Sequence, residues 1–403
     1  MTQDKLQFQI PSGVNKWTTI GMGIGLVALI AGWFVDHTEH HQYWWANILI
    51  NGFFFFAISL GAMFFYALQY ATEAAWSAMV KRVFEAMFQF IPVGVGIVLL
   101  VVLAGQFHIN HLYHWMDPEL HDVNSPAYDE IIANKKPYLS AWFFWLRMLA
   151  YAGVFIYFSR KFREWSIQED TEGGTVLHYM QYRKSAVFLV FFAVFSSTMS
   201  WDVLMSIDTH WYSTMYGWYI FSGMWVTTMI FATLSIVWMK NLGYFQNLND
   251  SHIHDLGKWI FAISMLWSYL WFCQYMLIWY SDIPEEITYF KERYEHYMGM
   301  MWTIFFVNFV VPFYVLLSRD AKRNTKYLTR VGVIIFISHF FDLYLAVVPG
   351  TNHGHETFTF WFELGLFIGF LGLFVRMFTS ALTKANLIPV KHPFLEESEH
   401  HSI

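Results

Sequence analysis

No polar or charged side chain interrupts the stretch VGVGIVLLVVLA, residues 93–104. It lies within an apolar segment, residues 83–106, that exceeds the roughly 20 residues a helix needs to cross a membrane. A helix that is apolar on every side is buried either in lipid or in the core of a large protein. The segment therefore predicts a transmembrane helix, with a buried helix of a soluble protein as the alternative.

Nine further apolar segments exclude the soluble alternative by their number and length. The sequence predicts an all-α integral membrane protein with ten transmembrane helices. We expect one membrane domain over residues 17–380, an N-terminal tail over 1–16 and a C-terminal tail over 381–403, both tails cytoplasmic. The predicted helices are 17–35, 44–71, 83–106, 139–159, 185–207, 217–239, 259–281, 298–318, 331–349 and 357–380.

Composition excludes other classes of protein. Hydrophobic residues make up 56% of the 403 residues and charged residues only 13%, against about 25% charged in a soluble domain. Such a chain cannot cover a globule with a hydrated surface, so an ordinary soluble enzyme, a disordered chain and a nucleic-acid binder are excluded. The single cysteine, Cys273, excludes an internal disulfide and a cysteine-ligated iron–sulfur cluster.

The orientation in the membrane follows from the distribution of Lys and Arg. The two tails and the connections on the same side of the predicted bundle carry 19 of them, and the opposite connections carry four. Positively charged connections stay in the cytoplasm, so we expect both termini there, which agrees with an even number of helices. Histidines gather on the other side, where they predict either a metal site or, as we prefer, a contact with a partner: His37, His40, His41, His108, His111, His114, His121, His210, His296, His353 and His355.

A weak internal repeat relates the two halves of the chain. Five basic residues precede each of the fifth and ninth helices, and these helices carry Asp202 and Asp342 in their outer halves. The offset of about 140 residues spans four helices and preserves orientation, as in a parallel repeat. Coincidence among apolar segments is the alternative.

Five ionisable side chains fall inside the predicted helices, where each costs about 3 kcal/mol to insert. At 1.5 Å per residue the groups with the clearest depth lie roughly 8–12 Å from the outer surface and could share one cavity. Carboxylates and histidine at such a depth indicate a proton relay open to the outer side; a structural ion pair between Arg147 and a carboxylate is the alternative. The five are Arg147, Asp202, His339, Asp342 and Glu363.

A second polar trail begins at the cytoplasmic surface. Glu73 ends the second predicted helix, Glu85 begins the third, and Thr198 and Ser200 precede Asp202 on the fifth. These groups predict a route for protons from the cytoplasm toward Asp202. The alternative is that the hydroxyls bond only their own helix.

Redox centres are not expected on this chain. A membrane b-haem needs two axial histidines at bilayer depth, and only His339 lies there. The histidine spacings match no common metal motif, and no phosphate-binding loop is present. We therefore predict no haem, iron–sulfur cluster or metal on the chain, and any electron transfer uses a quinone or cofactors of partner subunits.

Five segments together resemble a known family, the NrfD/PsrC-like membrane subunits of respiratory oxidoreductases. The likeness covers most of residues 17–380 and is most specific in the Asp-containing fifth helix and in WYSDIPEE at 279–286. The segments are LGAMFFYALQYATEAAWSAMVKRVFEA at 60–86, KKPYLSAWFFWLRMLAY at 135–151, SWDVLMSIDTHWYSTMYGWYIFSG at 200–223, WSYLWFCQYMLIWYSDIPEEI at 267–287 and VVPFYVLLSRDAKRN at 310–324.

The resemblance implies a place in a bacterial inner-membrane complex that oxidises quinol and reduces cytochrome c or another electron acceptor, of the alternative complex III type. It implies two four-helix bundles, helices 2–5 and 6–9, with two peripheral helices. It also implies partners: a sister NrfD-like subunit, a multihaem cytochrome c and an iron–sulfur subunit. This chain would contribute assembly, a proton path and a quinone-facing pocket, without redox chemistry of its own. Asn308 stands where similar chains often have His, which weakens a proton or quinone role there.

Two other functions stay open from the residues alone. A stand-alone secondary transporter with a parallel repeat is one, although Pro92 and Pro312 are isolated and do not form a pair of broken helices at matching positions. A purely structural membrane anchor is the other, since the sequence does not separate it from a proton-conducting subunit.

Overall fold

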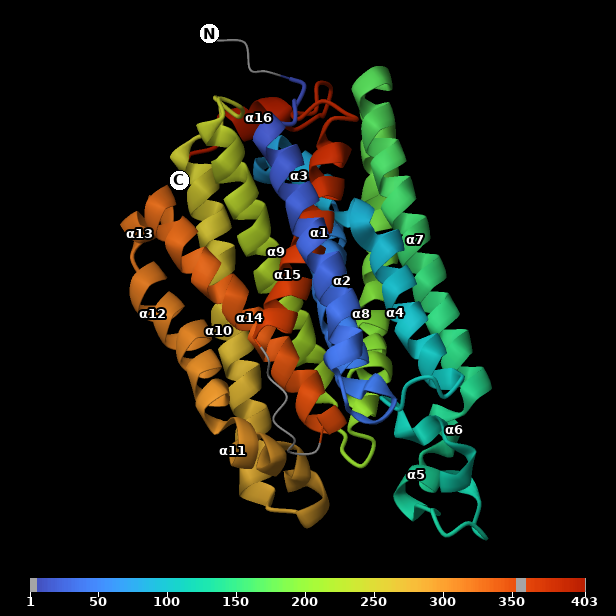
Figure 1. Cartoon of the computed structure of the whole chain (residues 1–403). Coiled ribbons are helices and arrows are strands. Elements are labelled where there is room, and N and C mark those ends of the chain that lie inside the picture. The colour runs from blue at the N-terminus through green and yellow to red at the C-terminus, as the bar shows by residue number, and fades with distance from the viewer. Residues whose placement is uncertain (1–5, 353–359, 403) are drawn as a thin grey trace.

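Ten long helices form a single elongated bundle in the computed structural model, which describes residues 6–352 and 360–402 (Figure 1). All ten are long and apolar enough to span a membrane, and no strand occurs among the described residues, so the predicted all-α membrane fold is confirmed. They are α1 (Ser12–Val35), α2 (Gln42–Ala71), α3 (Lys81–Met87) continued by α4 (Ile91–Gln106), α7 (Ala141–Glu172), α8 (Val176–Val203), α9 (Met215–Asn241), α10 (Asp250–Ser281), α11 (Pro284–Phe305) continued by α12 (Val311–Leu316), α14 (Thr325–Asn352) and α15 (Trp361–Leu382). Four short helices lie in connections: α5 (Glu130–Asn134), α6 (Lys136–Leu139), α13 (Arg319–Arg323) and α16 (Leu395–Glu399).

The helix α2 is the centre of the molecule. All residues of its most apolar stretch are buried inside the protein, whereas only 28% of those in the corresponding stretch of α1 are buried. It packs against α4 and α8 on one side and against α9 and α14 on the other. The elements α2, α3–α4, α7 and α8 thus form one four-helix group, and α9, α10, α11–α12 and α14 form the second.

The first and last spanning helices form a separate pair on the outside of the bundle. Glycines of α1 face glycines of α15: a Cβ added to Gly369 would lie 2.5 Å from the Cα of Gly25, and one added to Gly365 would lie 2.6 Å from the Cβ of Ala28. Small residues let helix backbones approach closely in a membrane. We call this contact the glycine seam.

Two of the spans are interrupted just before a proline. A 3-10 turn over Phe88–Phe90 separates α3 from α4, whose second residue is Pro92, and a π-helical turn over Phe306–Val310 separates α11 from α12, whose second residue is Pro312. Proline donates no backbone hydrogen bond and disfavours a helical residue before it. The interruptions therefore follow from the prolines that the sequence shows.

The segment 160–184, expected as a connection, is mostly helical. The helix α7 continues to Glu172 and α8 begins at Val176, with a turn at Gly173 and Gly174, whose φ angles are +68° and +74°. Glycine adopts this left-handed conformation without strain. Both helices extend past their apolar parts. Hydropathy did not predict these extensions because the sequence beyond residue 159 is polar.

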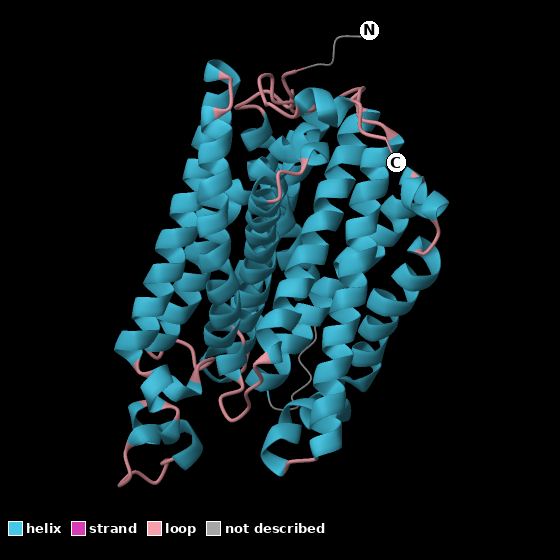
Figure 2. Cartoon of the chain, turned by 180° about the vertical axis from the view of Figure 1, so that it is seen from behind, coloured by secondary structure: helices cyan, strands magenta, loops and turns pink. Residues whose placement is uncertain are grey.

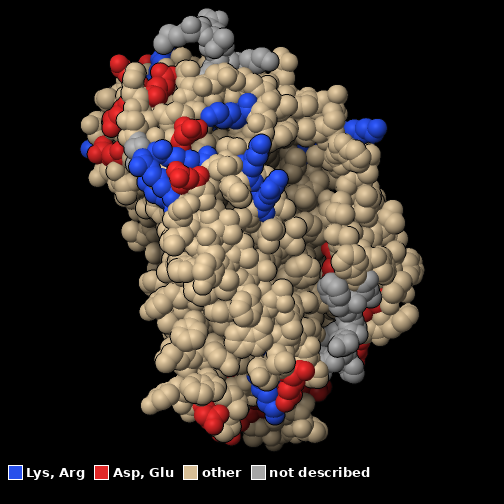
Figure 3. Space-filling view, turned by 90° about the vertical axis from the view of Figure 1, so that its left-hand side faces the viewer, with Lys and Arg blue, Asp and Glu red and all other residues tan. Residues whose placement is uncertain are grey.

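Both ends of the described chain lie at one end of the bundle, which we call the termini end (Figures 1 and 2). The side of the molecule seen in Figure 3 has a wide belt without charged residues between two charged ends, and most of the blue atoms lie near the termini end. Large apolar side chains such as Phe34, Trp142 and Val190 are exposed, as expected for a surface in contact with lipid. Lys5, His353 and His355 lie outside the described residues.

Candidate functional site

Arg147 and Asp202 form a closed ion pair between α7 and α8. Nε of Arg147 donates to Oδ2 of Asp202 at 2.8 Å and Nη2 donates to Oδ1 at 2.7 Å, while the Tyr151 hydroxyl donates to Oδ2 at 2.8 Å. Asp202 is fully buried, and the guanidinium stacks on the ring of Tyr138 at 3.9 Å. A bidentate pair of this kind is among the strongest side-chain contacts, and it fixes α7 to α8.

The hydroxyls predicted to lead to Asp202 bond their own helix. Thr198 donates to the carbonyl of Val194 at 3.0 Å, and Ser200 donates to that of Ser196 at 2.7 Å. Both hydroxyls therefore have the local role that was the alternative.

Asp342 of α14 lies in the second four-helix group with different partners. It accepts hydrogen bonds from the Tyr219 hydroxyl of α9 and, at 3.0 Å, from Nε1 of Trp267 of α10. Nδ1 of His339 lies 3.6 Å from Oδ2 of Asp342, and both ring nitrogens of this buried histidine lack a hydrogen-bond partner. His339 and Asp342, three residues apart, thus lie on one face of α14.

Two cavities meet at Asp342. One, with about 30 Å³ of space for water, is lined by Asp342 and His339 and by residues of α2 and α9, and the other, with about 20 Å³, is lined by Asp342, Arg293 and Gln274. Tyr219 lines both. Asp342 and Tyr219 thus lie between two small cavities, each with room for about one or two water molecules.

Arg293 is a buried cation that the sequence analysis assigned to an outer connection. Its Nη2 lies 3.2 Å from Oδ2 of Asp208, its Nε donates to the carbonyl of Leu345 at 2.9 Å, and its guanidinium stacks on Tyr289 at 3.3 Å. The signal in the sequence was its distance of about 146 residues from Arg147, close to the predicted repeat offset. Each group of four helices therefore holds one buried arginine stacked on a tyrosine and paired with an aspartate.

Glu363, at the start of α15, belongs to a third cluster. It is buried and accepts a hydrogen bond from the Tyr43 hydroxyl, which lies 3.2 Å from the Tyr344 hydroxyl. The five intramembrane groups predicted from depth thus have three sets of partners: Arg147 with Asp202, His339 with Asp342, and Glu363 with Tyr43. Among the described residues these groups do not share one cavity, contrary to expectation. Residues at the same depth in the membrane can lie on different sides of the bundle, and the sequence gives only the depth.

Glu85 belongs to a dense charge network at the termini end. Its Oε2 accepts from Arg82 at 2.9 Å and from Arg163 at 2.8 Å, and its Oε1 accepts from Ser166 at 2.5 Å. Arg82 also pairs with Asp170 at 2.6 Å. Glu85 and Arg82 are almost completely buried, and such charges are stable only when paired and hydrogen-bonded.

A second buried pair, Lys81 with Glu169, adjoins this network. Nζ of Lys81 lies 2.6 Å from Oε2 of Glu169 and 2.8 Å from the Tyr70 hydroxyl. Lys81 also lines a narrow cavity, with about 20 Å³ of space for water, together with Gln69 and Glu73. Glu73 is exposed in the turn after α2 and lines this cavity. Glu85, the next residue of the predicted polar trail, lies instead in the charge network behind the cavity.

Sequence analysis missed most of this network. Arg163, Ser166, Glu169 and Asp170 were treated as a connection, but they recur at three- and four-residue steps and lie on one face of α7. That periodicity was the available signal. It was overlooked because a charged segment next to an apolar one usually lies outside the membrane domain.

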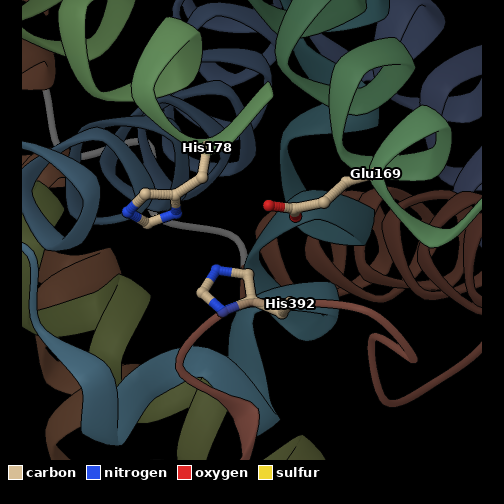
Figure 4. A group of neighbouring side chains, drawn as sticks. All are labelled: Glu169, His178 and His392. Carbon is tan, nitrogen blue, oxygen red and sulfur yellow. The ribbon is translucent and has the colours of Figure 1, made fainter. Parts of the chain in front are cut away.

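Glu169 also approaches two histidines, and this group is the candidate metal centre. The carboxylate, His178 of α8 and His392 of the C-terminal segment have one ligand atom each within 4.8 Å of one another, and all three residues are buried (Figure 4). Burial, with the charges of Lys81, His178 and Arg82, holds the pKa of His392 well below its usual range, so its imidazole is neutral at pH 7. The sequence analysis predicted no metal because these residues come from distant segments and follow no spacing rule.

The opposite end of the bundle carries a polar surface formed by the long connection 107–138. Nε2 of His210 lies 2.6 Å from Oδ2 of Asp129, beside a surface hollow of about 1410 Å³. Partial burial raises the pKa of Asp129, but the hydrogen bonds from His210 and from the Ile132 amide outweigh it, so the pKa is lowered. Burial and the neighbouring His40 and His108 likewise lower the pKa of His111.

Comparison with known proteins adds no assignment: no family model matches the chain, and no curated protein matches it.

Proposed function

We propose that this chain is a membrane subunit of a respiratory complex that oxidises quinol and passes the electrons to cytochrome c or another acceptor. The proposal rests on the resemblance to NrfD/PsrC-like subunits, in particular to ActF of alternative complex III, and on the ten-helix fold. In this proposal haem c and iron–sulfur clusters reside on partner subunits and this chain performs no redox step itself. It lies in the bacterial inner membrane with both termini in the cytoplasm, beside a sister NrfD-like subunit.

The His339–Asp342 pair is the observation that carries a proton-conducting role. A relay needs groups that exchange protons and space for water on both sides of them. His339 has two unpartnered ring nitrogens 3.6 Å from the carboxylate, and Asp342 lines both interior cavities. No other carboxylate predicted from the sequence has this combination among the described residues.

The termini end supplies an entry for protons in the same proposal. Glu73 is exposed beside the narrow cavity, with about 20 Å³ of space for water, that is lined by Tyr66, Tyr70 and Lys81. A carboxylate that is open to solvent exchanges protons with water. The Arg147–Asp202 pair, whose carboxylate oxygens are fully engaged, acts in this scheme as a structural clamp.

Asp342→Asn tests the proton role in the purified complex. Asn keeps the shape of the side chain and accepts hydrogen bonds but does not carry a proton at neutral pH. We expect normal subunit content and quinol oxidation, with proton movement in reconstituted vesicles reduced at least tenfold. Asp342→Glu is the matched control, because it restores a carboxylate and should retain most of the proton movement.

The same preparation separates the alternatives. Normal assembly of Asp342→Asn with unchanged proton movement would contradict the relay and favour a structural anchor. Isolation of the chain as a stable monomer without haem-bearing partners, active in transport by itself, would contradict the complex and favour a secondary transporter.

A further inference from the structure

The C-terminal segment closes over a buried pocket at the termini end of the bundle. Nζ of Lys391 donates to the carbonyl of Thr171 at 2.6 Å, and the amide of Val390 donates to Asp170 at 3.1 Å. These contacts place His392 over the turn between α7 and α8. The pocket beneath it is therefore formed where the C-terminal segment meets the α7–α8 turn, which is far from it in the sequence.

Three unsatisfied ligand atoms converge in this pocket. Both ring nitrogens of His178 and Oε1 of Glu169 are buried without a hydrogen-bond partner. In Figure 4 the two imidazole rings and the carboxylate surround a common point, and one ligand atom of each lies within 4.8 Å of the others. Orphaned buried polar atoms are rare in proteins and commonly mark a place for water or an ion.

The contacts around the pocket leave these atoms available. Lys81 engages only Oε2 of Glu169, so Oε1 is free to bind a cation. Nδ1 of His392 accepts from the Phe394 amide at 3.2 Å, which leaves Nε2 as the nitrogen for the pocket. Ligation through Nε2 puts the ring proton on Nδ1, so this contact in a loop must yield when the metal binds.

We propose that Glu169, His178 and His392 bind one divalent transition-metal cation of the zinc type. Two imidazoles and one carboxylate form a ligand set that zinc accepts, with a fourth position for water. The cavity lined by His178 and His392 adjoins the cluster, and its space for water of about 20 Å³ is room for one such ligand. The bound cation would tie the C-terminal segment to α7 and α8, a role that does not depend on the proposed respiratory function.

Zn²⁺ binding to the purified full chain tests the site. The chain is prepared with a tag that contains no histidine, stripped with a chelator, exposed to Zn²⁺ and assayed for bound metal, and its affinity is measured by chelator competition. We expect one tightly bound Zn²⁺ per chain, and at least 100-fold weaker binding in His178→Gln and in His392→Gln. His254→Gln is the matched control, because His254 is also buried and lies near the start of α10; it should bind like the unchanged chain.

Lys81→Met is a second test, because it should strengthen Zn²⁺ binding where the histidine variants weaken it. Its ammonium group lies 2.6 Å from the carboxylate and opposes a cation there, so its removal should tighten Zn²⁺ binding about tenfold or more. A metal held adventitiously by exposed histidines would not respond to this change.

Co²⁺ on the unchanged chain keeps the proposal testable even where a variant fails to fold. A four-coordinate site gives strong visible absorption, whereas surface ions in octahedral coordination give almost none. Absence of that absorption, or a Zn²⁺ content no higher than in His178→Gln, would overturn the proposal.

Discussion

Asp202 makes three hydrogen bonds to Arg147 and Tyr151, and this decides how its substitution should act. Asp202→Asn leaves Arg147 without its counter-charge in a partly buried position. Removing one partner of a buried pair costs about 3–5 kcal/mol, so the melting temperature of the solubilised chain and the yield of assembled complex should fall. The double change Asp202→Asn with Arg147→Gln should recover most of the loss, because it removes both charges.

The relay interpretation of Asp202 predicts a different result. In that case Asp202→Asn assembles and melts normally while proton movement in vesicles falls. A variant of normal stability would therefore contradict the structural clamp, and unchanged proton movement in the same variant would contradict the relay.

The sequence predicted individual intramembrane residues where an ionisable side chain lies in an apolar segment, because inserting such a group into a membrane is costly. Arg147, Asp202 and Asp342 stand out in apolar segments, and an ion pair between Arg147 and a carboxylate was one of the two interpretations that the sequence left open. Tyr219, Trp267 and Tyr151 were not predictable, because tyrosine and tryptophan are common throughout this chain and only three-dimensional packing selects the few that reach a carboxylate.

At the scale of helices, Gly25 is the critical residue of the glycine seam, because a Cβ added to it would lie 2.4 Å from the Cα of Gly369. Gly25→Leu should force α1 away from α15, since the added side chain would meet backbone that cannot yield. We expect a marked drop in melting temperature and protease access to the N-terminal segment. Gly23→Leu is the matched control: it lies on the same helix with nothing within 4 Å of an added Cβ and should leave both measurements unchanged. Equal behaviour of the two variants would show that the seam does not hold α1.

The connection 107–138 should respond to pH through His111. The ring of His111 stacks on His40 at 4.0 Å, and the pKa of His111 lies below its usual 6.5 because of burial and the nearby His40 and His108. A lowered pKa in the folded state stabilises the fold above the unfolded pKa, and this stabilisation is lost as the pH falls below about 6.5 toward the folded value. Hydrogen exchange of residues 107–114, corrected for intrinsic rates, should therefore be faster at pH 5.5 than at pH 7.5. His111→Gln should remove most of this difference, and an equal difference in that variant would assign it to other groups.

Elements were more predictable than their contacts. Length and hydropathy gave all ten spans, because a membrane demands about 20 apolar residues for each. The extension of α7 to Glu172 escaped because a helix may continue beyond the apolar layer, where composition no longer marks it. The pairing of α1 with α15 escaped because close approach depends on shape at a few glycines and not on hydropathy.

The Lys and Arg on the side of the molecule seen in Figure 3 lie near its two ends, and their distribution predicts the topology in the membrane. Both described ends of the chain lie at the termini end (Figure 1), where most of these Lys and Arg are found (Figure 3), and the positive-inside rule places that end in the cytoplasm. In a chain carrying Cys273→Ala, a single cysteine at Asn124→Cys should react with an impermeant maleimide from outside intact spheroplasts. A single cysteine at Glu172→Cys should react only after permeabilisation; both positions are exposed. The reverse labelling pattern would show that the chain has the opposite orientation in the membrane.

The glycine seam joins helices that leave the ribosome at very different times. About 340 residues separate Gly25 from Gly369, and at about 5–20 residues per second the ribosome needs roughly 17–70 s to synthesise them. During that interval α1 is already in the bilayer, and its glycine groove is not yet covered by α15. Its groove is then open to lipid, to insertion chaperones or to the α15 of a neighbouring nascent copy. The helix α1 is thus among the last of the ten to reach its native place, and crowded synthesis on one message would favour exchange of α1 between copies.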